Sequence, residues 1–164
     1  TMGRGEGPDC YCYPNVVLRK TIDSLSNNYA YVVMDNEAGM EHLSRRTTQN
    51  IDALLLVSSH SIKGIRTIGR IKALVSELKL RVTKEFLVVN MVPGALAPEL
   101  REELNRWNLT PAALIPEDEL LYEYDLKQKP LLDMPGSSRA VAAVNELMDQ
   151  ITKQVPTVNS GEKR

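Results

Sequence analysis

The chain has 164 residues, of which 43% are hydrophobic and 25% are charged, and its formal net charge is −1. This length suits one domain with one core, and the composition is that of an ordinary globular protein. A nearly neutral chain has no global attraction to nucleic acid or anionic lipid, and no apolar stretch is long enough to cross a bilayer. We therefore expect a cytoplasmic protein without nucleic-acid or membrane partners, with one domain over residues 1–155 and a flexible tail over residues 156–164.

A loop opens the chain, because residues 3–14 contain three glycines and two prolines. Within it, Cys10 and Cys12 are separated by one residue, so both thiols can point to one side of an extended backbone. A closed thiolate site needs four ligands, and these are the only two cysteines, so two copies of the chain would have to meet. Four thiolates would suit Zn²⁺, Ni²⁺ or an iron–sulfur cluster, whereas the simpler alternative is two ordinary thiols.

A helix with Leu18, Ile22 and Leu25 on one face is expected next, and it is followed by a possible ligand site. The apolar run at residues 31–35 predicts a buried parallel strand that ends in Asp35. At the carboxyl end of such a strand a carboxylate can hold a Mg²⁺ water, and the bare backbone of Gly39 can approach a phosphate. The alternative for Asp35 is a helix cap or an Asx-turn.

Strands and helices then alternate, which predicts an α/β fold with a mostly parallel sheet and helices on both faces. Apolar runs indicate the strands, and apolar stripes at helical spacing indicate the helices. Lys63, Arg66 and Arg70 share a basic stripe, for which a solvated face is a better explanation than a DNA contact. In order, we expect a strand at 53–57, a helix at 62–78, a strand at 86–91, a helix from Pro98, a strand at 112–115 and a helix after Ser137 or Ser138 with Val141, Val144, Leu147, Met148 and Ile151 inward.

Asn90 ends the strand at 86–91. Its amide could offer both a hydrogen-bond donor and an acceptor to the edge of a base. The alternative is that Asn90 is a turn residue at a strand end, and its position alone does not decide between the two.

Four segments, at residues 7–15, 35–47, 64–67 and 88–90, together resemble the carbon monoxide dehydrogenase accessory ATPases. These nickel-insertion proteins belong to the MinD/ParA-like P-loop group. The resemblance implies an ATP-dependent switch that forms a homodimer through its Cys-x-Cys loop and serves carbon monoxide dehydrogenase as client. It also implies ATP or ADP with Mg²⁺, and Ni²⁺ or Zn²⁺ at the dimer interface. The implied roles are metal binding by Cys10 and Cys12, Mg²⁺ binding by Asp35, sensing of the terminal phosphate by the turn with Ala38 and Gly39, adenine binding by Asn90, and a place beside the base for Pro116 and Glu117.

The sequence departs from this family because it contains no Gly-rich loop that ends in Gly-Lys-Ser or Gly-Lys-Thr. We therefore expect a carboxyl-terminal portion that lacks the first strand and the P-loop, with no useful ATPase activity and little stability alone. In related folds the first strand lies beside the strand of Asp35, so its loss would leave an open hydrophobic slot.

Three other functions remain open. A partition or division-site ATPase would have no need of Cys-x-Cys. An electron-transfer protein like the nitrogenase iron protein would hold an iron–sulfur cluster between its thiolates. A non-catalytic remnant would bind only metal or a partner.

Overall fold

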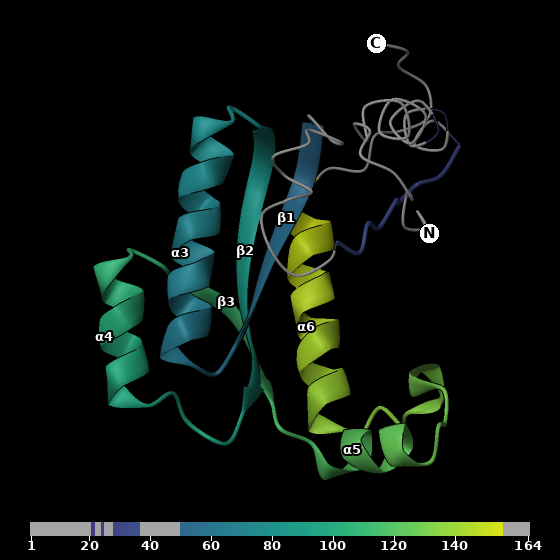
Figure 1. Ribbon diagram of the computed structural model, residues 1–164. Coiled ribbons are helices and arrows are strands. Elements are labelled where there is room, and N and C mark those ends of the chain that lie inside the picture. The colour runs from purple at the N-terminus through teal and green to yellow at the C-terminus, as the bar shows by residue number, and fades with distance from the viewer. Residues whose placement is uncertain (1–20, 22–23, 25–27, 37–49, 156–164) are drawn as a thin grey trace, which may run out of the picture.

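The computed structural model describes residues 21, 24, 28–36 and 50–155. Residues 50–155 form one sheet with helices on both sides (Figure 1). Three parallel strands lie in the order β1-β2-β3. Helices α3 and α4 lie on one side of this sheet and α6 on the other. The predicted α/β fold is therefore confirmed. The elements are β1 Asn50–Ser59, α3 Ile62–Glu77, β2 Arg81–Val92, α4 Pro98–Arg106, β3 Pro111–Pro116, α5 Glu119–Leu126, the 3₁₀ turn η1 Leu131–Asp133 and α6 Arg139–Gln154.

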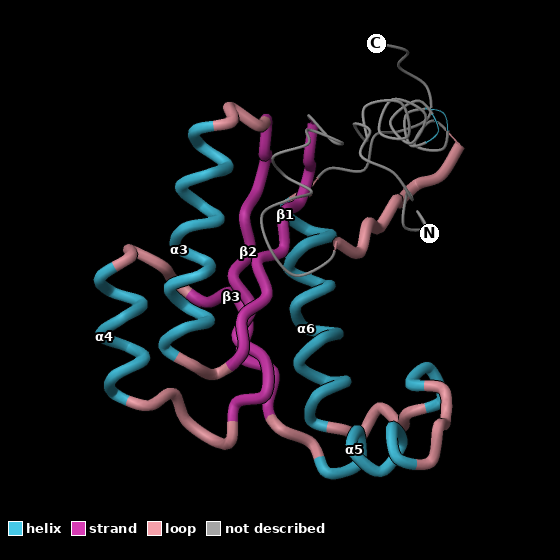
Figure 2. Tube along the Cα trace, in the orientation of Figure 1, coloured by secondary structure: helices cyan, strands magenta, loops and turns pink. Residues whose placement is uncertain are grey.

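Each of the predicted strands at 53–57, 86–91 and 112–115 lies inside a longer observed strand. β1 pairs with β2 from Asn50 opposite Arg81 to Ser59 opposite Asn90. β2 pairs with β3 up to Val92 opposite Pro116. Because all three strands run in one direction, their carboxyl ends meet at the lower edge of the sheet in Figure 2.

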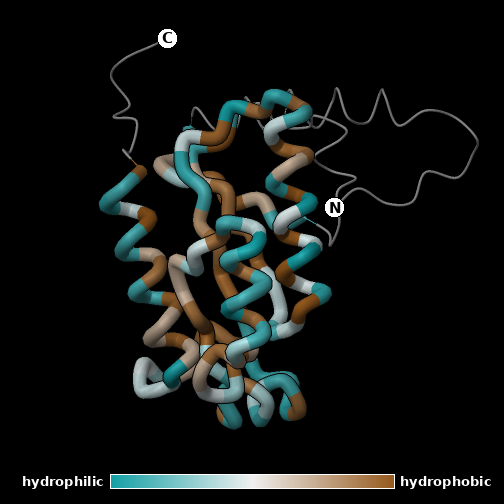
Figure 3. Tube along the Cα trace, turned by 90° about the vertical axis from the view of Figure 1, so that its left-hand side faces the viewer, coloured by the Kyte–Doolittle hydropathy of each residue, from teal (hydrophilic) through white to brown (hydrophobic). Residues whose placement is uncertain are grey.

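The strand β2 lies at the centre of two hydrophobic cores, one on each face of the sheet. Its residues alternate between them, since successive side chains of a strand point to opposite faces. Figure 3 shows hydrophobic residues gathered on the strands, between helices of mixed hydropathy. The core under α3 and α4 contains Leu56, Ile65, Ile68, Leu87, Val89, Val92, Leu100, Leu104 and Leu109. The core under α6 contains Phe86, Val88, Ile115, Ala140, Leu147 and Ile151.

A buried carboxylate joins α3 to α4. Glu103 is only 4% exposed, and its two oxygens accept hydrogen bonds from Arg66 Nε at 3.0 Å and Nη2 at 3.2 Å. Arg106 Nη1 at 3.1 Å and Trp107 Nε1 at 3.0 Å donate to the same carboxylate. Arg66, expected on a solvated face, is thus partly engaged in a bidentate ion pair. The Trp107 ring also packs on Gly69, where an added Cβ would lie 2.4 Å from ring carbons.

The prediction that Val144 and Met148 of α6 point inward is wrong. Their side chains are 43% and 42% exposed, whereas Ala140, Leu147 and Ile151 of the same helix are buried. The reason is that α6 packs mainly over β3, at the far side of the sheet from β1.

The face of β1 on the α6 side is consequently bare. Leu55 and Val57 are 41% and 57% exposed, although Phe86 and Val88, opposite them on β2, are buried. Among the described residues no strand pairs with the other edge of β1. The open hydrophobic slot expected from the sequence concerns the strand of Asp35 and stays a prediction.

The predicted strand at residues 31–35 is also wrong for this structure. Residues 31–36 form no helix or strand, and Tyr31 and Val33 are 61% and 89% exposed. A strand exists only where a neighbouring strand pairs with its backbone, and the described sheet ends at β1. An apolar run supplies the side chains of a strand but not the partner.

The predicted first helix lies almost entirely outside the described residues. Thr21 and Ser24 are helical, and Asn28 Nδ2 donates a hydrogen bond of 3.2 Å to the carbonyl oxygen of Ser24. Such a bond satisfies one of the free carbonyl groups at a helix end, as expected of an asparagine that follows the helix.

The Glu103 network predicts a stability that depends on pH. Its pKa is lowered by the hydrogen bond from Arg66 first, with further contributions from Trp107 and the charges of Arg66 and Arg106. The network therefore stabilises the fold fully above the ordinary glutamate pKa of about 4.3, and this contribution is lost as the pH falls through the lower folded-state pKa. We expect Glu103→Gln to destabilise the protein most above about pH 5, and progressively less toward about pH 3.

Urea unfolding at a series of pH values measures this difference, with the exposed neighbour variant Glu102→Gln as the control. A cost of Glu103→Gln that stays constant down to pH 3 would contradict the role of the ionised carboxylate.

Candidate functional site

The carboxyl ends of the three strands bring several polar groups to one edge of the sheet. Ser59 at the end of β1 lies opposite Asn90 of β2, and Pro116 at the end of β3 lies opposite Val92. The backbone N–H of Glu117 donates to the carbonyl oxygen of Val92 at 3.0 Å. The structure thus places Asn90, Pro116 and Glu117, three of the predicted site residues, at the edge where open α/β sheets bind ligands.

A bulge in β2 fixes the position of Asn90. The pairing between β2 and β3 shifts register between Val89 and Val92, and Met91 has a left-handed φ of 56°. The side-chain oxygen of Asn90 accepts a hydrogen bond of 2.9 Å from the backbone N–H of Met91. Within the described part of the chain, the amide nitrogen of Asn90 has no partner, so it is available as a donor.

A serine-rich loop from Ser58 to Ser61 lies beside Asn90 at the end of β1. Ser58 Oγ donates to the Ser59 carbonyl oxygen at 2.8 Å, and the hydroxyls of Ser59 and Ser61 are 3.0 Å apart. Ser61 begins α3, because its side chain accepts from the N–H of Gly64 at 3.0 Å. His60 Nε2 is buried without a hydrogen-bond partner among the described residues. The residues from Ser58 to Ser61 were not predicted as part of a site. A cluster of serines directly after a parallel strand is nevertheless a sequence signal of a possible ligand site.

Asp118 connects the loop after β3 to two helices. One carboxylate oxygen accepts from the N–H of Leu120 at 2.9 Å and so caps α5. The other accepts from Ser138 Oγ at 2.7 Å and from the N–H of Ala140 at 3.2 Å, in the first turn of α6. These hydrogen bonds, that from Ser138 first, lower the pKa of the Asp118 carboxyl. No local sequence pattern indicates these partners of Asp118.

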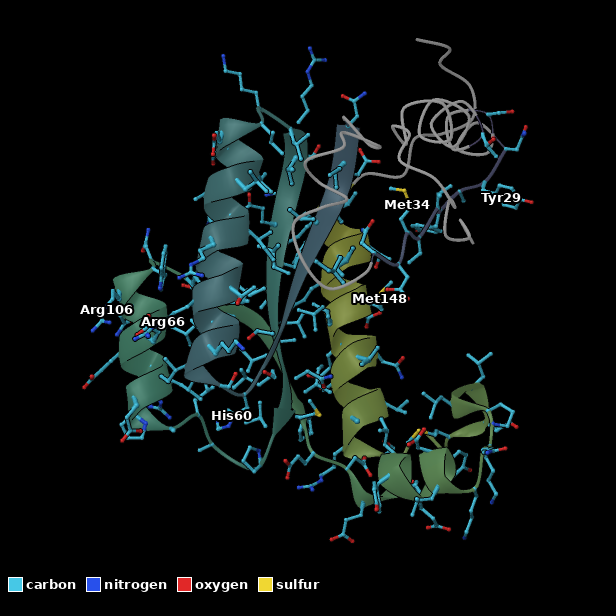
Figure 4. The ribbon with its side chains drawn as sticks, viewed as in Figure 1. Tyr29, Met34, His60, Arg66, Arg106 and Met148 are labelled. Carbon is cyan, nitrogen blue, oxygen red and sulfur yellow. The ribbon has the colours of Figure 1, made fainter. Side chains whose placement is uncertain are left out.

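Asp35 does not lie at this edge. Its carboxylate is exposed on the segment of residues 31–36, outside the sheet. Figure 4 shows Met34, the residue before Asp35, in the upper half of the molecule on the same side as Met148 of α6, while His60 lies at the lower edge. The structure therefore does not bring Asp35 together with Asn90.

The remaining predicted site residues, Cys10, Cys12, Ala38 and Gly39, lie outside the described residues. Among the residues that are described, no three His, Cys, Asp or Glu side chains form a cluster that could hold a metal ion. The predicted Ni²⁺ or Zn²⁺ site at Cys10 and Cys12 therefore stays a prediction. No helix in the described ranges is both long and apolar enough to cross a membrane.

Comparison with known proteins identifies the fold. No protein-family model matches the chain. An uncharacterized ATP-binding protein of Methanocaldococcus jannaschii is 39% identical over 154 residues, which cover 92% of this chain and 59% of that protein. The MinD cell division protein of Aquifex aeolicus superposes with a TM-score of 0.68 at 20% identity, covering 88% of this chain and 64% of that one. The septum site-determining protein MinD of Pyrococcus horikoshii, complexed with Mg-ADP, gives a TM-score of 0.66 at 19% identity, over 85% and 57% of the two chains.

The chain thus has the α/β fold of the MinD-like P-loop ATPases, as predicted. It spans 59% of the length of the curated relative from M. jannaschii. The structural neighbours are about one-fifth identical, so they define the fold.

The contact between Gly64 and the serine-rich loop gives a stability prediction. A Cβ on Gly64 would lie 2.4 Å from Ser58 Oγ and 3.1 Å from the Ser59 carbonyl oxygen. We expect Gly64→Ala to lower the free energy of unfolding by about 1–3 kcal/mol through overpacking, although alanine favours helix by about 1 kcal/mol.

Gly136→Ala is the matched control, because nothing lies within 4 Å of its added Cβ. Its free energy of unfolding should stay within about 0.5 kcal/mol of the wild-type value in urea denaturation. Equal stability of the two variants would show that the loop accommodates the methyl group.

Proposed function

We propose that this chain belongs to an ATP-binding protein of the MinD/ParA-like P-loop group, and that ATP or ADP with Mg²⁺ binds at the carboxyl edge of its sheet. The observation that carries the proposal is the meeting of Asn90, Pro116 and Glu117 at that edge of a MinD-like sheet. The ATP-binding name of the 39% identical relative supports it. Localisation in the cytoplasm is part of the same proposal.

Asn90 is proposed to bind the adenine base. Its Oδ1 is held by the Met91 N–H, so the amide nitrogen is presented as a donor in a fixed direction. A ring nitrogen of adenine is an acceptor that fits this donor. The half-buried Pro116 supplies an apolar surface for the base, and the hydrogen bond from the backbone N–H of Glu117 to the carbonyl oxygen of Val92 holds this loop to β2.

The phosphates and Mg²⁺ are assigned by resemblance to Asp35, Ala38 and Gly39. A carboxylate is a suitable partner for a Mg²⁺ ion and its waters, and the exposed carboxylate of Asp35 fits this chemistry. For this role residues 31–36 must reach the carboxyl edge of the sheet, a position that they do not have in this structure. The Gly-rich loop that binds phosphate in P-loop ATPases is not among these 164 residues, so the experiments below use the protein as the cell makes it.

A more specific candidate is metal delivery to carbon monoxide dehydrogenase by a homodimer. The Cys10-Tyr11-Cys12 motif favours it, because two copies would provide four thiolates for one Ni²⁺ or Zn²⁺ ion. A division-site or partition ATPase is the alternative, and the MinD-like fold is compatible with it.

The adenine contact predicts a selective loss of affinity in Asn90→Ala. Removal of the side-chain donor should weaken ATP binding about tenfold, which corresponds to about 1.4 kcal/mol, the upper range for one hydrogen bond. Binding of inorganic tripolyphosphate should not change, since it has no base. Isothermal titration of both ligands measures the effect, and Asn105→Ala, an exposed position on α4, is the control.

Absence of ATP binding by the wild-type protein would contradict the proposed function. Equal loss of affinity for ATP and tripolyphosphate in Asn90→Ala would contradict only the assignment of the base contact.

The metal proposal has its own test in Cys10→Ser/Cys12→Ser. We expect the wild-type protein to bind one Ni²⁺ or Zn²⁺ ion per dimer and the double variant to bind none, while ATP affinity stays unchanged. Elemental analysis together with sedimentation measures metal and oligomeric state. A dimer that forms equally well without the cysteines would favour the division-site or partition alternative.

A further inference from the structure

Asp118 makes more contacts than a helix cap requires. An N-cap side chain accepts from one or two backbone N–H groups of its own helix, and Asp118 does this for α5 through Leu120. Its second oxygen reaches Ser138 and Ala140, 20 and 22 residues further along the chain, at the start of α6. Ser138 already caps α6 by accepting from the N–H of Val141 at 3.1 Å. The bond between Asp118 and Ser138 is therefore a connection between a loop and a helix.

A second contact holds the same loop to the same helix. Arg139 Nη2 donates to the carbonyl oxygen of Glu117 at 3.2 Å. On its other side Glu117 donates its N–H to Val92 of β2. The backbone of Glu117 is thus held between the sheet and the first turn of α6. Ser138 is only 4% exposed, so its bond to Asp118 is shielded from water.

We propose that Asp118 is a positioning residue, which fixes the Pro116–Glu117 loop at the carboxyl edge of the sheet by tying it to the start of α6. This inference rests on the proposed function, because Pro116 and Glu117 are the residues assigned to the base. We assign Asp118 no contact with the nucleotide, because its carboxylate is already occupied by hydrogen bonds from Leu120, Ser138 and Ala140. Its effect is on which base the site accepts.

Asp118→Asn is the informative variant. The amide keeps one oxygen for Leu120, so α5 remains capped, but it presents an NH₂ group toward the N–H of Ala140 and cannot accept there. We expect affinity for ATP to fall about five- to tenfold and the preference for ATP over GTP to fall with it, whereas affinity for tripolyphosphate stays within about twofold. Ser138→Ala removes one of the two bonds from Asp118 to α6 and also the cap at Val141, which lowers stability, and it should give the same pattern of affinities with a smaller change.

Glu103→Gln is the matched control, because Glu103 is also a carboxylate with several hydrogen bonds, but it joins α3 to α4. This variant should be less stable and yet keep the wild-type preference for ATP over GTP. If Asp118 had only a structural role, Asp118→Asn would also keep the wild-type preference for ATP over GTP. Its affinities for ATP and for tripolyphosphate would then fall by one common factor. That result would overturn the positioning role.

The outcome also separates this inference from the proposed function. Wild-type protein that binds no ATP overturns both. Wild-type protein that binds ATP, together with an Asp118→Asn variant whose base preference is unchanged, overturns only the role of Asp118. Should Asp118→Asn fail to fold, Ser138→Ala decides by the same comparison, since it leaves the Asp118 carboxylate and its bonds to Leu120 and Ala140 in place.

Discussion

The burial of β2 on both faces is the constraint on which the rest of the structure depends. Its residues from Phe86 to Val89 are all buried, alternately toward α3 and toward α6. A strand with two apolar faces is stable only when both are covered, and here helices on each side cover a sheet whose strands run parallel, as is typical of this class. Parallel strands in turn place all their carboxyl ends at one edge. The position of Asn90 beside Ser59 and the loop after β3 is a consequence of this packing.

The elements that the sequence predicted well are those with a local physical cause. Continuous apolar runs predicted all three strands of the described sheet, and Ser61, Pro98 and Ser138 each mark the beginning of a helix. The errors concern features set by neighbours. Residues 31–35 have the side chains of a buried strand, but no strand of the described sheet pairs with them. Val144 and Met148 have helical spacing but lie beside an uncovered part of the sheet.

The candidate site was predictable to the same extent. The resemblance to a known family grouped Asn90, Pro116 and Glu117, and the structure places them at the carboxyl ends of β2 and β3, where parallel strands of an open sheet place ligands. The contacts that hold the loop after β3 could not be predicted, since Asp118 reaches Ala140, 22 residues away, through a bond that no local pattern encodes. Asp35 shows most clearly what a motif cannot predict. Its Mg²⁺-binding role was predicted from residues 31–39, and the structure describes only part of this motif, up to residue 36.

The contact of Trp107 with Gly69 and Glu103 has a practical consequence. Trp107 is the single tryptophan of these 164 residues, and its indole N–H donates to a buried carboxylate at the junction of α3 and α4. The fluorescence emission of an indole depends on its environment. The Trp107 ring has a buried carboxylate at its N–H edge and the backbone of Gly69 against its face. The protein therefore carries a native fluorophore that reports on the junction between these two helices, on the opposite side of the sheet from α6, without any label.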